Sequence, residues 1–258
     1  METKHVLTLS VVIPAHNEDQ CIEATVRALH SKLSAEAIDH EILVINDNSR
    51  DKTEQVLQTL QKEIPQLRYI NNQPPNGFGF AVRCGLDNFK GDAVAVYMAD
   101  ASDTPTDLVK FYRTLVEKNV DCVFGTRWSR QSRVVDYPKF KLYANRAVNL
   151  FIRALFGMRY NDTTNAFKLY RREVIQGIKP FLSHHFNLTV ELPLKSIVRG
   201  YSYAVVPNDW INRTTGESKL KLKEMGSRYL FIILYCFIER LLSRGDYRKK
   251  ENLALQSR

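Results

Sequence analysis

The stretch from Gly91 to Pro105, GDAVAVYMADASDTP, joins an apolar strand pattern to an acidic turn. Residues 92–98 are mostly apolar and form a short run, which predicts a buried strand. Two carboxylates, Asp100 and Asp103, follow at once, and the proline indicates a turn. Because ligands bind beyond the strand ends of open parallel sheets, this stretch predicts both an α/β fold and a functional site.

Strand-like and helix-like runs alternate outward from this stretch through the first half of the chain. Short β-favouring runs are followed by segments whose apolar residues recur at helical spacing. This order predicts an α/β fold with a mostly parallel, Rossmann-like central sheet flanked by helices on both faces. The expected strands are residues 9–15, 41–47, 67–72, 92–98 and 121–127. The expected helices are residues 22–33, 56–64 and 107–119, with a further one beginning near Gly79.

The composition is that of a folded globular protein with an uneven charge. With 258 residues and 44% hydrophobic content, the chain can bury one sizeable core, or one domain and a modest appendage. The net charge is +9, and the segment from Lys219 onward holds ten Lys and Arg against four Asp and Glu. Such a basic tail predicts an anionic partner, for which nucleic acid and anionic lipid are the usual candidates.

The four cysteines and the N-terminal residues bear on the compartment. No two cysteines form a CxxC pair, which favours reduced thiols over a disulfide framework or a zinc knuckle. The N-terminal residues lack the long apolar core of a signal peptide. We therefore expect the chain in a reducing compartment.

An apolar run from Tyr229 to Ile238 interrupts the basic tail. Its ten residues are too few to span a bilayer, which needs about 20. One interpretation is a helix that packs on the core of the domain. The other is an amphipathic helix at a membrane interface, whose flanking Lys and Arg contact anionic head groups. Nucleic acid is not expected as a partner, because the basic residues bracket an apolar run and not scattered aromatics.

Polar residues follow three of the expected strands. The first strand ends in Pro14–Glu18, the second in Asn46–Thr53, and the fourth at Asp100. No GxGxxG follows the first strand and no GxxxxGKS/T occurs, which argues against dinucleotide and P-loop sites. Strand-end carboxylates without phosphate-binding glycines favour a divalent cation, held by Asp, that bridges the diphosphate of a nucleotide.

Seven segments stand in order along the chain: VVIPAHNE (11–18), VINDNSRDKT (44–53), NGFGFAVRCG (76–85), YMADASDTP (97–105), VFGTR (123–127), DTTNAFKLYRR (162–172) and VPNDWINRTTGESKL (206–220). Taken in this order, they resemble the motifs of family 2 glycosyltransferases. They are most similar to the polyprenyl-phosphate sugar transferases of the dolichol-phosphate mannose synthase type, over roughly residues 9–220. The resemblance implies a GT-A fold, with residues 1–220 as the nucleotide-sugar-binding catalytic domain and 221–258 as a basic amphipathic segment at the membrane interface.

The resemblance also implies roles for individual residues. Asp100 and Asp103 would hold Mg²⁺ or Mn²⁺ at the diphosphate, Asp47 would recognise the base or ribose, and Arg127 would lie near the donor. The implied catalytic residues are Asp100, Asp103, Arg213 and Lys219. The implied donor-binding residues are Pro14, Ala15, His16, Asn17, Glu18, Asp47, Asn48, Arg127 and Ser218.

The chain departs from the family pattern at three places. In the aligned D-A-D-x-Q/S motif, alanine stands at both metal-binding aspartates. Either Asp100 and Asp103 form a shifted pair on a turn, or the chain is a weakly metal-binding or inactive relative. Asn46 replaces the first Asp of the second acidic motif, and Asn165-Ala166 replaces the usual Ser-Gly. The last change leaves the acceptor open.

The chemistry of sugar transfer favours one acceptor class. A divalent metal with Arg or Lys neutralises the departing diphosphate. A lipid phosphate is already anionic and needs no strong base, whereas a hydroxyl acceptor would need a carboxylate such as Glu191, a residue equally consistent with a structural role. We expect an inverting, metal-dependent transferase from UDP- or GDP-sugar to a polyprenyl phosphate, peripheral on the cytoplasmic membrane face. A transferase to a glycan hydroxyl and a non-catalytic nucleotide-sugar-binding relative stay open as alternatives.

Overall fold

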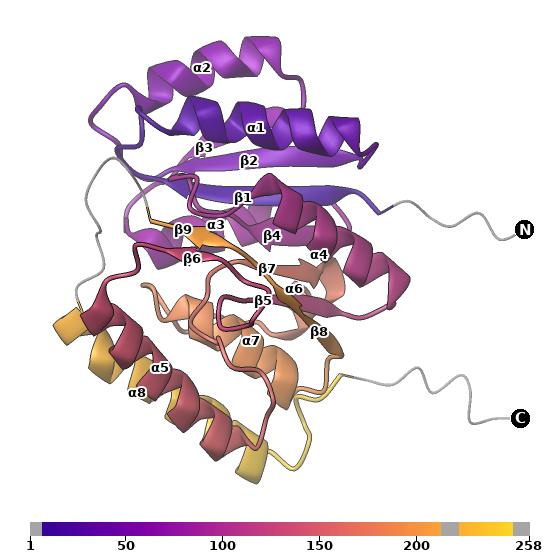
Figure 1. Cartoon of the computed structure of the whole chain (residues 1–258), viewed down its shortest axis with the longest axis vertical. Coiled ribbons are helices and arrows are strands. Elements are labelled where there is room, and N and C mark those ends of the chain that lie inside the picture. Colours follow the sequence, from indigo (N-terminus) through magenta and orange to yellow (C-terminus); the bar gives the residue numbers. More distant parts are fainter. Residues whose placement is uncertain (1–6, 213–221, 250–258) are drawn as a thin grey trace, which may run out of the picture.

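The computed structural model describes residues 7–212 and 222–249, and its centre is a seven-stranded sheet (Figure 1). The strand order is β3-β2-β1-β4-β7-β5-β8. All neighbouring pairs are parallel except those of β7, which runs antiparallel to β4 and β5. This confirms the predicted mostly parallel α/β fold. The strands are β1 (Leu9–Ala15), β2 (His40–Asn46), β3 (Leu67–Asn71), β4 (Ala93–Val96), β5 (Cys122–Thr126), β7 (Lys168–Arg171) and β8 (Tyr203–Pro207).

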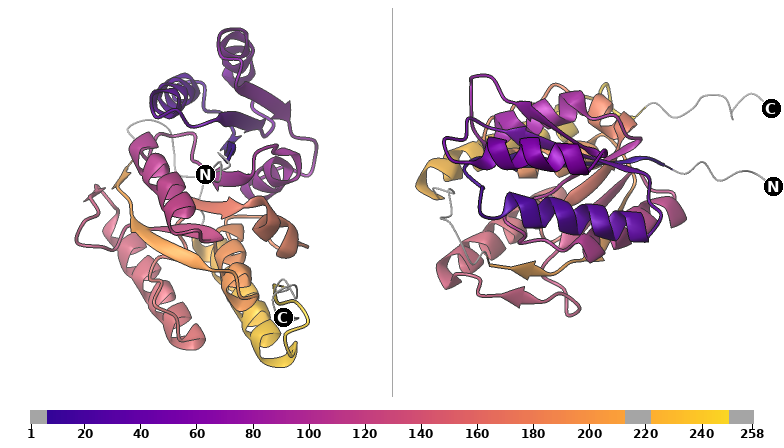
Figure 2. Two further views of the ribbon diagram at one scale, coloured as in Figure 1. Left: turned by 90° about the vertical axis from the view of Figure 1, so that its right-hand side faces the viewer. Right: turned by 90° about the horizontal axis from the view of Figure 1, so that it is seen from above.

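Helices cover both faces of this sheet (Figure 2). Successive side chains of a strand point to opposite faces, so Val11 joins the core under α1, α2 and α4, while Val12 joins the core under α3, α6 and α7. These helices are α1 (Ile22–Ala35), α2 (Thr53–Glu63), α3 (Phe78–Asn88), α4 (Pro105–Glu117), α6 (Arg172–Gly177) and α7 (Leu188–Val198).

A third apolar core lies where α7 meets α5 (Lys139–Phe156) and α8 (Leu222–Leu242) (Figure 1). Ile152 of α5, Leu194 of α7 and Ile233 of α8 are buried in it. Arg199, directly after α7, forms a buried ion pair with Glu239 of α8 at an Nε–Oε1 distance of 2.8 Å. The C-terminal helix therefore packs on the preceding part of the chain, and the division at residue 220 stays a prediction.

Several elements that shape the site were not predicted. β6 (Val134–Val135) and β9 (Trp210–Ile211) form a separate parallel two-stranded sheet, and two residues are too few to show a periodicity. α5 was not predicted either, although its apolar residues have helical spacing. No helix in residues 7–212 or 222–249 is long and apolar enough to cross a membrane.

Candidate active site

One large cavity joins the strand ends of the sheet to the helices α5 and α8. Its volume is about 1080 Å³. At one end it is lined by Pro14, Ala15, His16, Glu18 and Asp47, which follow β1 and β2. Its middle is lined by Asp100, Asp103, Arg127, Tyr137 and Trp210, and its far end by Phe140, Lys141, Val148, Phe186, Arg228 and Tyr229. The fold thus brings most of the predicted site residues into one continuous space.

The carboxylate of Asp47 organises the end of the cavity beside β2. The side chain is only 5% exposed. Its Oδ2 accepts a hydrogen bond from the backbone N–H of Gly77 (2.7 Å), and its Oδ1 accepts from the amides of Asn72 (2.7 Å) and Asn76 (3.0 Å). Gly77 has φ +135°, a conformation that L side chains rarely adopt. Asp47 therefore holds the turn before α3 against the floor of the cavity.

Two predicted donor-binding residues, Asn17 and Asn48, lie outside the cavity lining. Both are exposed and have φ near +55°, at 53° and 57°, which asparagine tolerates. The side-chain oxygen of Asn17 accepts a hydrogen bond from the backbone of Arg50 at 2.8 Å, and its own N–H donates to Ser49. In the structure these contacts connect the loops after β1 and β2, and a direct contact with the donor stays a prediction.

Asp100 and Asp103 face the same cavity from the loop after β4. The Asp100 carboxylate accepts a hydrogen bond from the backbone of Ser102 at 3.1 Å, and the Tyr97 hydroxyl donates to the backbone oxygen of Asp103. Burial, together with the charge of Asp100, raises the pKa of Asp103 to about 8. Two carboxylates this close repel each other, so a cation between them would be favourable.

This pair fits a divalent cation that also binds the substrate. Among the described residues there is no group of three or more His, Cys, Asp or Glu that could hold a metal ion. Mg²⁺, however, is commonly held by one or two carboxylates together with substrate phosphates and water. Asp100 and Asp103 supply two such carboxylates at the middle of the cavity.

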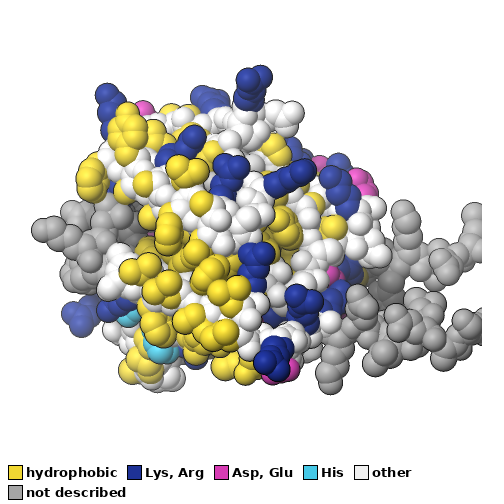
Figure 3. Space-filling model, turned by 90° about the horizontal axis from the view of Figure 1, so that it is seen from below, with side chains coloured by type: hydrophobic (Ala, Val, Ile, Leu, Met, Phe, Trp, Pro, Cys, Tyr) yellow, Lys and Arg dark blue, Asp and Glu magenta, His cyan; other side chains and the backbone are white. Residues whose placement is uncertain are grey.

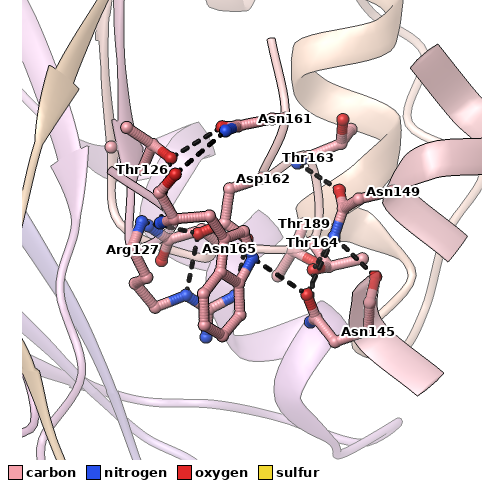
Figure 4. A network of polar contacts seen from close by, with 12 residues as sticks. Thr126, Arg127, Asn145, Asn149, Asn161, Asp162, Thr163, Thr164, Asn165 and Thr189 are labelled. Atoms are coloured by element: carbon pink, nitrogen blue, oxygen red, sulfur yellow. Dashed lines mark hydrogen bonds and ion pairs between the residues drawn. The ribbon is translucent and has the colours of Figure 1, made fainter. Parts of the chain in front are cut away.

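Arg127 follows β5 and is bound to Asp162 in a buried ion pair (Figure 4). Its Nε donates to one carboxylate oxygen at 2.9 Å and its Nη2 to the other at 2.7 Å. Burial opposes the charge, but Asp162 nevertheless holds the pKa of Arg127 above its ordinary value. The guanidinium also lies 5.4 Å from the ring centroid of Trp128 and 5.6 Å from that of Tyr137. Arg127 thus has a fixed position in the cavity wall.

A network of polar side chains links this wall to α5 (Figure 4). Asn145 of α5 accepts from the indole N–H of Trp128 at 3.2 Å and donates to the hydroxyl of Thr164 at 2.7 Å. Asn149, one turn later, donates to Asn145 and accepts from the backbone of Thr163. Sequence reasoning missed these residues, and the only signal was the amide and hydroxyl side chains near the DTTNAF segment.

The far end of the cavity combines aromatic and basic side chains. The rings of Phe78 and Phe186 stack with centroids 4.2 Å apart. A Cβ on Gly79 would lie 2.3 Å from the backbone carbon of His184, so glycine permits the close approach of α3 to the segment that carries Phe186. Lys141 of α5 and Arg228 of α8 add positive charge at this end. Of these residues only Arg228 was assigned a role from the sequence, as one of the basic residues that flank the apolar run and were expected to contact anionic head groups.

Glu191, the candidate base for a hydroxyl acceptor, lies away from the cavity. The residue is fully buried and accepts hydrogen bonds from the backbone N–H groups of Leu182 and Ser183, both at 2.7 Å. Its carboxylate also pairs with Lys195 at 2.6 Å. This arrangement favours the structural role. The remaining predicted residues, Arg213, Ser218 and Lys219, lie outside the described residues.

Comparison with known proteins identifies the family. Residues 10–178 match the family described as Glycosyl transferase family 2. The chain belongs to this family. Membership confirms the predicted resemblance and supports the prediction that the chain is a glycosyltransferase enzyme.

Two relatives of this family 2 chain have names that refer to a polyprenyl phosphate. It is 27% identical over 231 residues to glycosyltransferase AglD of Haloferax volcanii, covering 86% of this chain and 36% of the relative. It is 29% identical over 220 residues to a dolichol-phosphate mannosyltransferase of Pyrococcus furiosus, covering 84% and 60%. It is 28% identical over 216 residues to the polyprenol monophosphomannose synthase of Mycolicibacterium smegmatis, covering 81% and 80%. The chain thus spans only part of the first two relatives.

Solved structures show the same fold. Glucosyl-3-phosphoglycerate synthase from Mycobacterium tuberculosis, crystallised with Mn²⁺ and UDP-glucose, superimposes with a TM-score of 0.67 at 19% identity, covering 91% of this chain and 79% of that one. The same enzyme with UDP gives a TM-score of 0.64 at 20% identity, with coverages of 91% and 80%. At this identity the likeness is one of fold, and it agrees with the predicted GT-A type.

Proposed function

We propose that this chain is an inverting, metal-dependent glycosyltransferase that moves a sugar from a UDP- or GDP-sugar to a polyprenyl phosphate. The observation that carries the proposal is the continuous cavity, which connects the strand ends of β1, β2 and β4 to the apolar helices α5 and α8. Family membership supports the reaction class. The names of two relatives support the lipid phosphate, and the UDP-bound neighbours support a nucleotide sugar.

The donor would lie along the strand ends with its nucleoside beside β1 and β2. Pro14 and Asp47 line that end of the cavity. The ring of His16 holds the backbone there, because its Nδ1 lies 2.6 Å from the backbone carbonyl oxygen of Asp47. The diphosphate would then reach the loop after β4. Asp100 and Asp103 would hold Mg²⁺ or Mn²⁺ there, and such a cation supplies stabilisation of the charge on the leaving diphosphate.

The bond changes need no proton transfer if the acceptor is a phosphate. An anionic oxygen of the acceptor forms a bond to the anomeric carbon from the side opposite the diphosphate. The bond from that carbon to the diphosphate oxygen breaks, and its electron pair leaves with the nucleoside diphosphate. Lys141 and Arg228, at the far end of the cavity, are placed to attract the acceptor phosphate. A glycan hydroxyl acceptor would need a base, and Glu191 does not reach the cavity.

The helices at the far end expose an apolar surface suited to a membrane (Figure 3). We name this surface, which faces the viewer in Figure 3, the α5–α8 face. Basic side chains lie among its apolar residues, and acidic ones are few. Its exposed apolar residues are Phe140, Tyr143, Leu150 and Phe151 of α5, and Leu230, Phe231, Leu234, Ile238, Leu241 and Leu242 of α8.

Peripheral binding at the cytosolic leaflet would place this face on the lipid from which the acceptor comes. Interfacial helices bind through buried apolar area together with the attraction of Lys and Arg to anionic lipids. One side of α8 is buried in the third core, and its other side is exposed. The helix therefore serves both as a core helix and as a surface helix. Part of the basic tail has another partner: Lys249 pairs with Asp121 at 2.8 Å.

Turnover tests this proposal against both alternatives. The full chain is incubated with Mn²⁺, with UDP- and GDP-sugars in turn, and with a short-chain polyprenyl phosphate in detergent. Formation of the polyprenyl-phosphate sugar supports the proposal. Transfer to a glycan hydroxyl but not to the lipid phosphate would favour the first alternative. Nucleotide-sugar binding without turnover on either acceptor would favour the non-catalytic relative.

A further inference from the structure

Three aromatic rings, those of Trp128, Tyr137 and Trp210, form a cluster at the middle of the cavity. The ring of Trp128 meets that of Tyr137 edge-on with centroids 5.6 Å apart, and Tyr137 lies 4.8 Å from Trp210. Tyr137 and Trp210 line the cavity, whereas Trp128 lies behind them. The Arg127 guanidinium also contacts the rings of Trp128 and Tyr137, which helps to fix the position of these two rings.

The backbone ties this cluster to the acidic loop. The N–H of Ile211 donates to the carbonyl oxygen of Ser102 at 3.1 Å, and that serine stands between Asp100 and Asp103 in the sequence. The backbone N–H of Trp210, one residue earlier, donates to the carbonyl oxygen of Arg133, which directly precedes β6, at 2.9 Å. We call Tyr137 and Trp210, the two members of the cluster that line the cavity, the aromatic wall. This wall lies directly beside the place where a donor diphosphate would bind, on the side of α5 and α8.

The side-chain polar atoms of Tyr137 and Trp210 have no hydrogen-bond partner within the part of the chain that the structure describes. Neither the Tyr137 hydroxyl nor the Trp210 indole N–H forms a hydrogen bond with a residue in 7–212 or 222–249. Both side chains are partly exposed, and a buried Tyr or Trp normally finds a partner for its polar atom. Both atoms are therefore available to a ligand in the cavity that the two side chains line.

We propose that Tyr137 and Trp210 form the wall against which the sugar ring of the donor packs, and that they select the sugar. This inference rests on the proposed function and deepens it. A hexose ring has an apolar face of C–H groups and a rim of hydroxyls, so an aromatic face can bury the former while the indole N–H and the phenol bind the latter. The cavity offers this combination between Asp103 and the acceptor end.

The test compares the affinity of the same protein for a nucleoside diphosphate and for the matching nucleotide sugar. Calorimetry with Mn²⁺ measures UDP against UDP-glucose, and GDP against GDP-mannose, for the wild-type chain and for Trp210→Ala. The substitution should weaken nucleotide-sugar binding about tenfold and leave nucleoside diphosphate binding within about twofold. Trp210→Phe should restore most of the lost affinity, and Tyr137→Phe should weaken only sugars whose hydroxyls reach the phenol.

A matched control is Tyr143→Ala, which removes an aromatic side chain that is 72% exposed on α5 and does not line the cavity. It should leave the ratio of the two affinities unchanged, and melting curves should show that all variants fold. Equal weakening of diphosphate and nucleotide sugar by Trp210→Ala, or no weakening of either, would overturn the inference. So would a loss confined to the lipid acceptor. A wild-type chain that binds none of the four ligands would refute the proposed function itself.

Discussion

The carboxylate of Asp162 holds both the side chain and the backbone of Arg127. Besides the two bonds to the guanidinium, one of its oxygens accepts from the backbone N–H of Arg127 at 2.9 Å (Figure 4). Asp162 is 0% and Arg127 8% exposed. Both charges are desolvated, so each depends on the other for compensation. Arg127, which was predicted to lie near the donor, is thus held in place by Asp162, a residue that was assigned no role from the sequence.

Asp162→Asn should destabilise the protein strongly, because it leaves the Arg127 charge buried with only a neutral partner. The free energy of unfolding in urea should fall by about 3–5 kcal/mol. The control is Asp87→Asn, which breaks the exposed pair with Lys179 and should change stability by less than about 1 kcal/mol. Similar small losses in both variants would show that the buried pair contributes little.

Asp103→Asn should remove the manganese-dependent part of donor affinity and leave the fold intact. The substitution keeps the shape of a buried side chain. Burial already raises the pKa of Asp103 to about 8, so without the cation the carboxyl is largely neutral near pH 7 and the melting temperature should not fall. Titration of the nucleotide sugar with and without Mn²⁺ measures the effect, with Asp87→Asn again as the control. Unchanged affinity in manganese would refute the shifted aspartate pair.

Glu191→Gln should reduce stability and spare turnover. The substitution leaves Lys195 as a buried charge beside a neutral amide, which costs about 3–5 kcal/mol in comparable buried pairs. Turnover per folded molecule, with the folded fraction taken from circular dichroism, should stay within a few-fold. A general base would lose about 10²–10⁴-fold. A loss of that size in folded protein would return Glu191 to the reaction.

The pair of His30 and His40 should make the fold less stable in mild acid. Burial, and to a lesser extent the charge of His30, lowers the pKa of His40 below its ordinary 6.5, while the Ile38 carbonyl and Asp39 partly oppose this. The unfolded chain then binds a proton that the folded chain resists, so the contribution of His40 to stability is complete above about pH 6.5 and is lost as the pH falls below it.

Urea midpoints between pH 5 and 8 measure this dependence. The difference in stability between the wild-type chain and His40→Asn should shrink as the pH falls through this range, because only the wild-type chain loses the His40 contribution. The same difference for an exposed histidine, as in His184→Asn, should not change in this way. A difference between wild type and His40→Asn that does not depend on pH would contradict the predicted linkage.

The α5–α8 face should bind anionic vesicles. Phe231, Leu234 and Ile238 are 59%, 43% and 53% exposed, so replacing all three by serine should leave the melting temperature nearly unchanged and abolish flotation with the vesicles. High salt should weaken but not abolish binding by the wild-type chain, because the apolar contribution of about 25 cal/mol per Å² is not screened. Val205→Ser, on the exposed side of β8, is the control. Full binding by the triple variant would refute the membrane surface.

Local patterns in the sequence were sufficient for five of the seven strands of the sheet, β1 to β5, and for one end of the cavity, whereas β7 and β8 were not predicted. The alternation of strand-like and helix-like runs predicted the parallel order, and polar residues at the ends of β1, β2 and β4 predicted where a ligand would bind. These features depend on neighbours along the chain, so they can be read from short windows. The resemblance to the family added roles for residues such as Asp47, which the structure places in the cavity lining.

The acceptor end could not be predicted in the same way. The residues of the C-terminal run show that it is apolar and flanked by basic residues, but they do not show that α8 packs on α7 while its other side faces outward. Likewise, no window of sequence connects Arg127 to Asp162 or Trp210 to the acidic loop. The tertiary structure decided these relationships, because the antiparallel insertion of β7 and the small β6–β9 sheet bring distant segments together. Contacts of this kind depend on packing between elements, which local periodicity does not record.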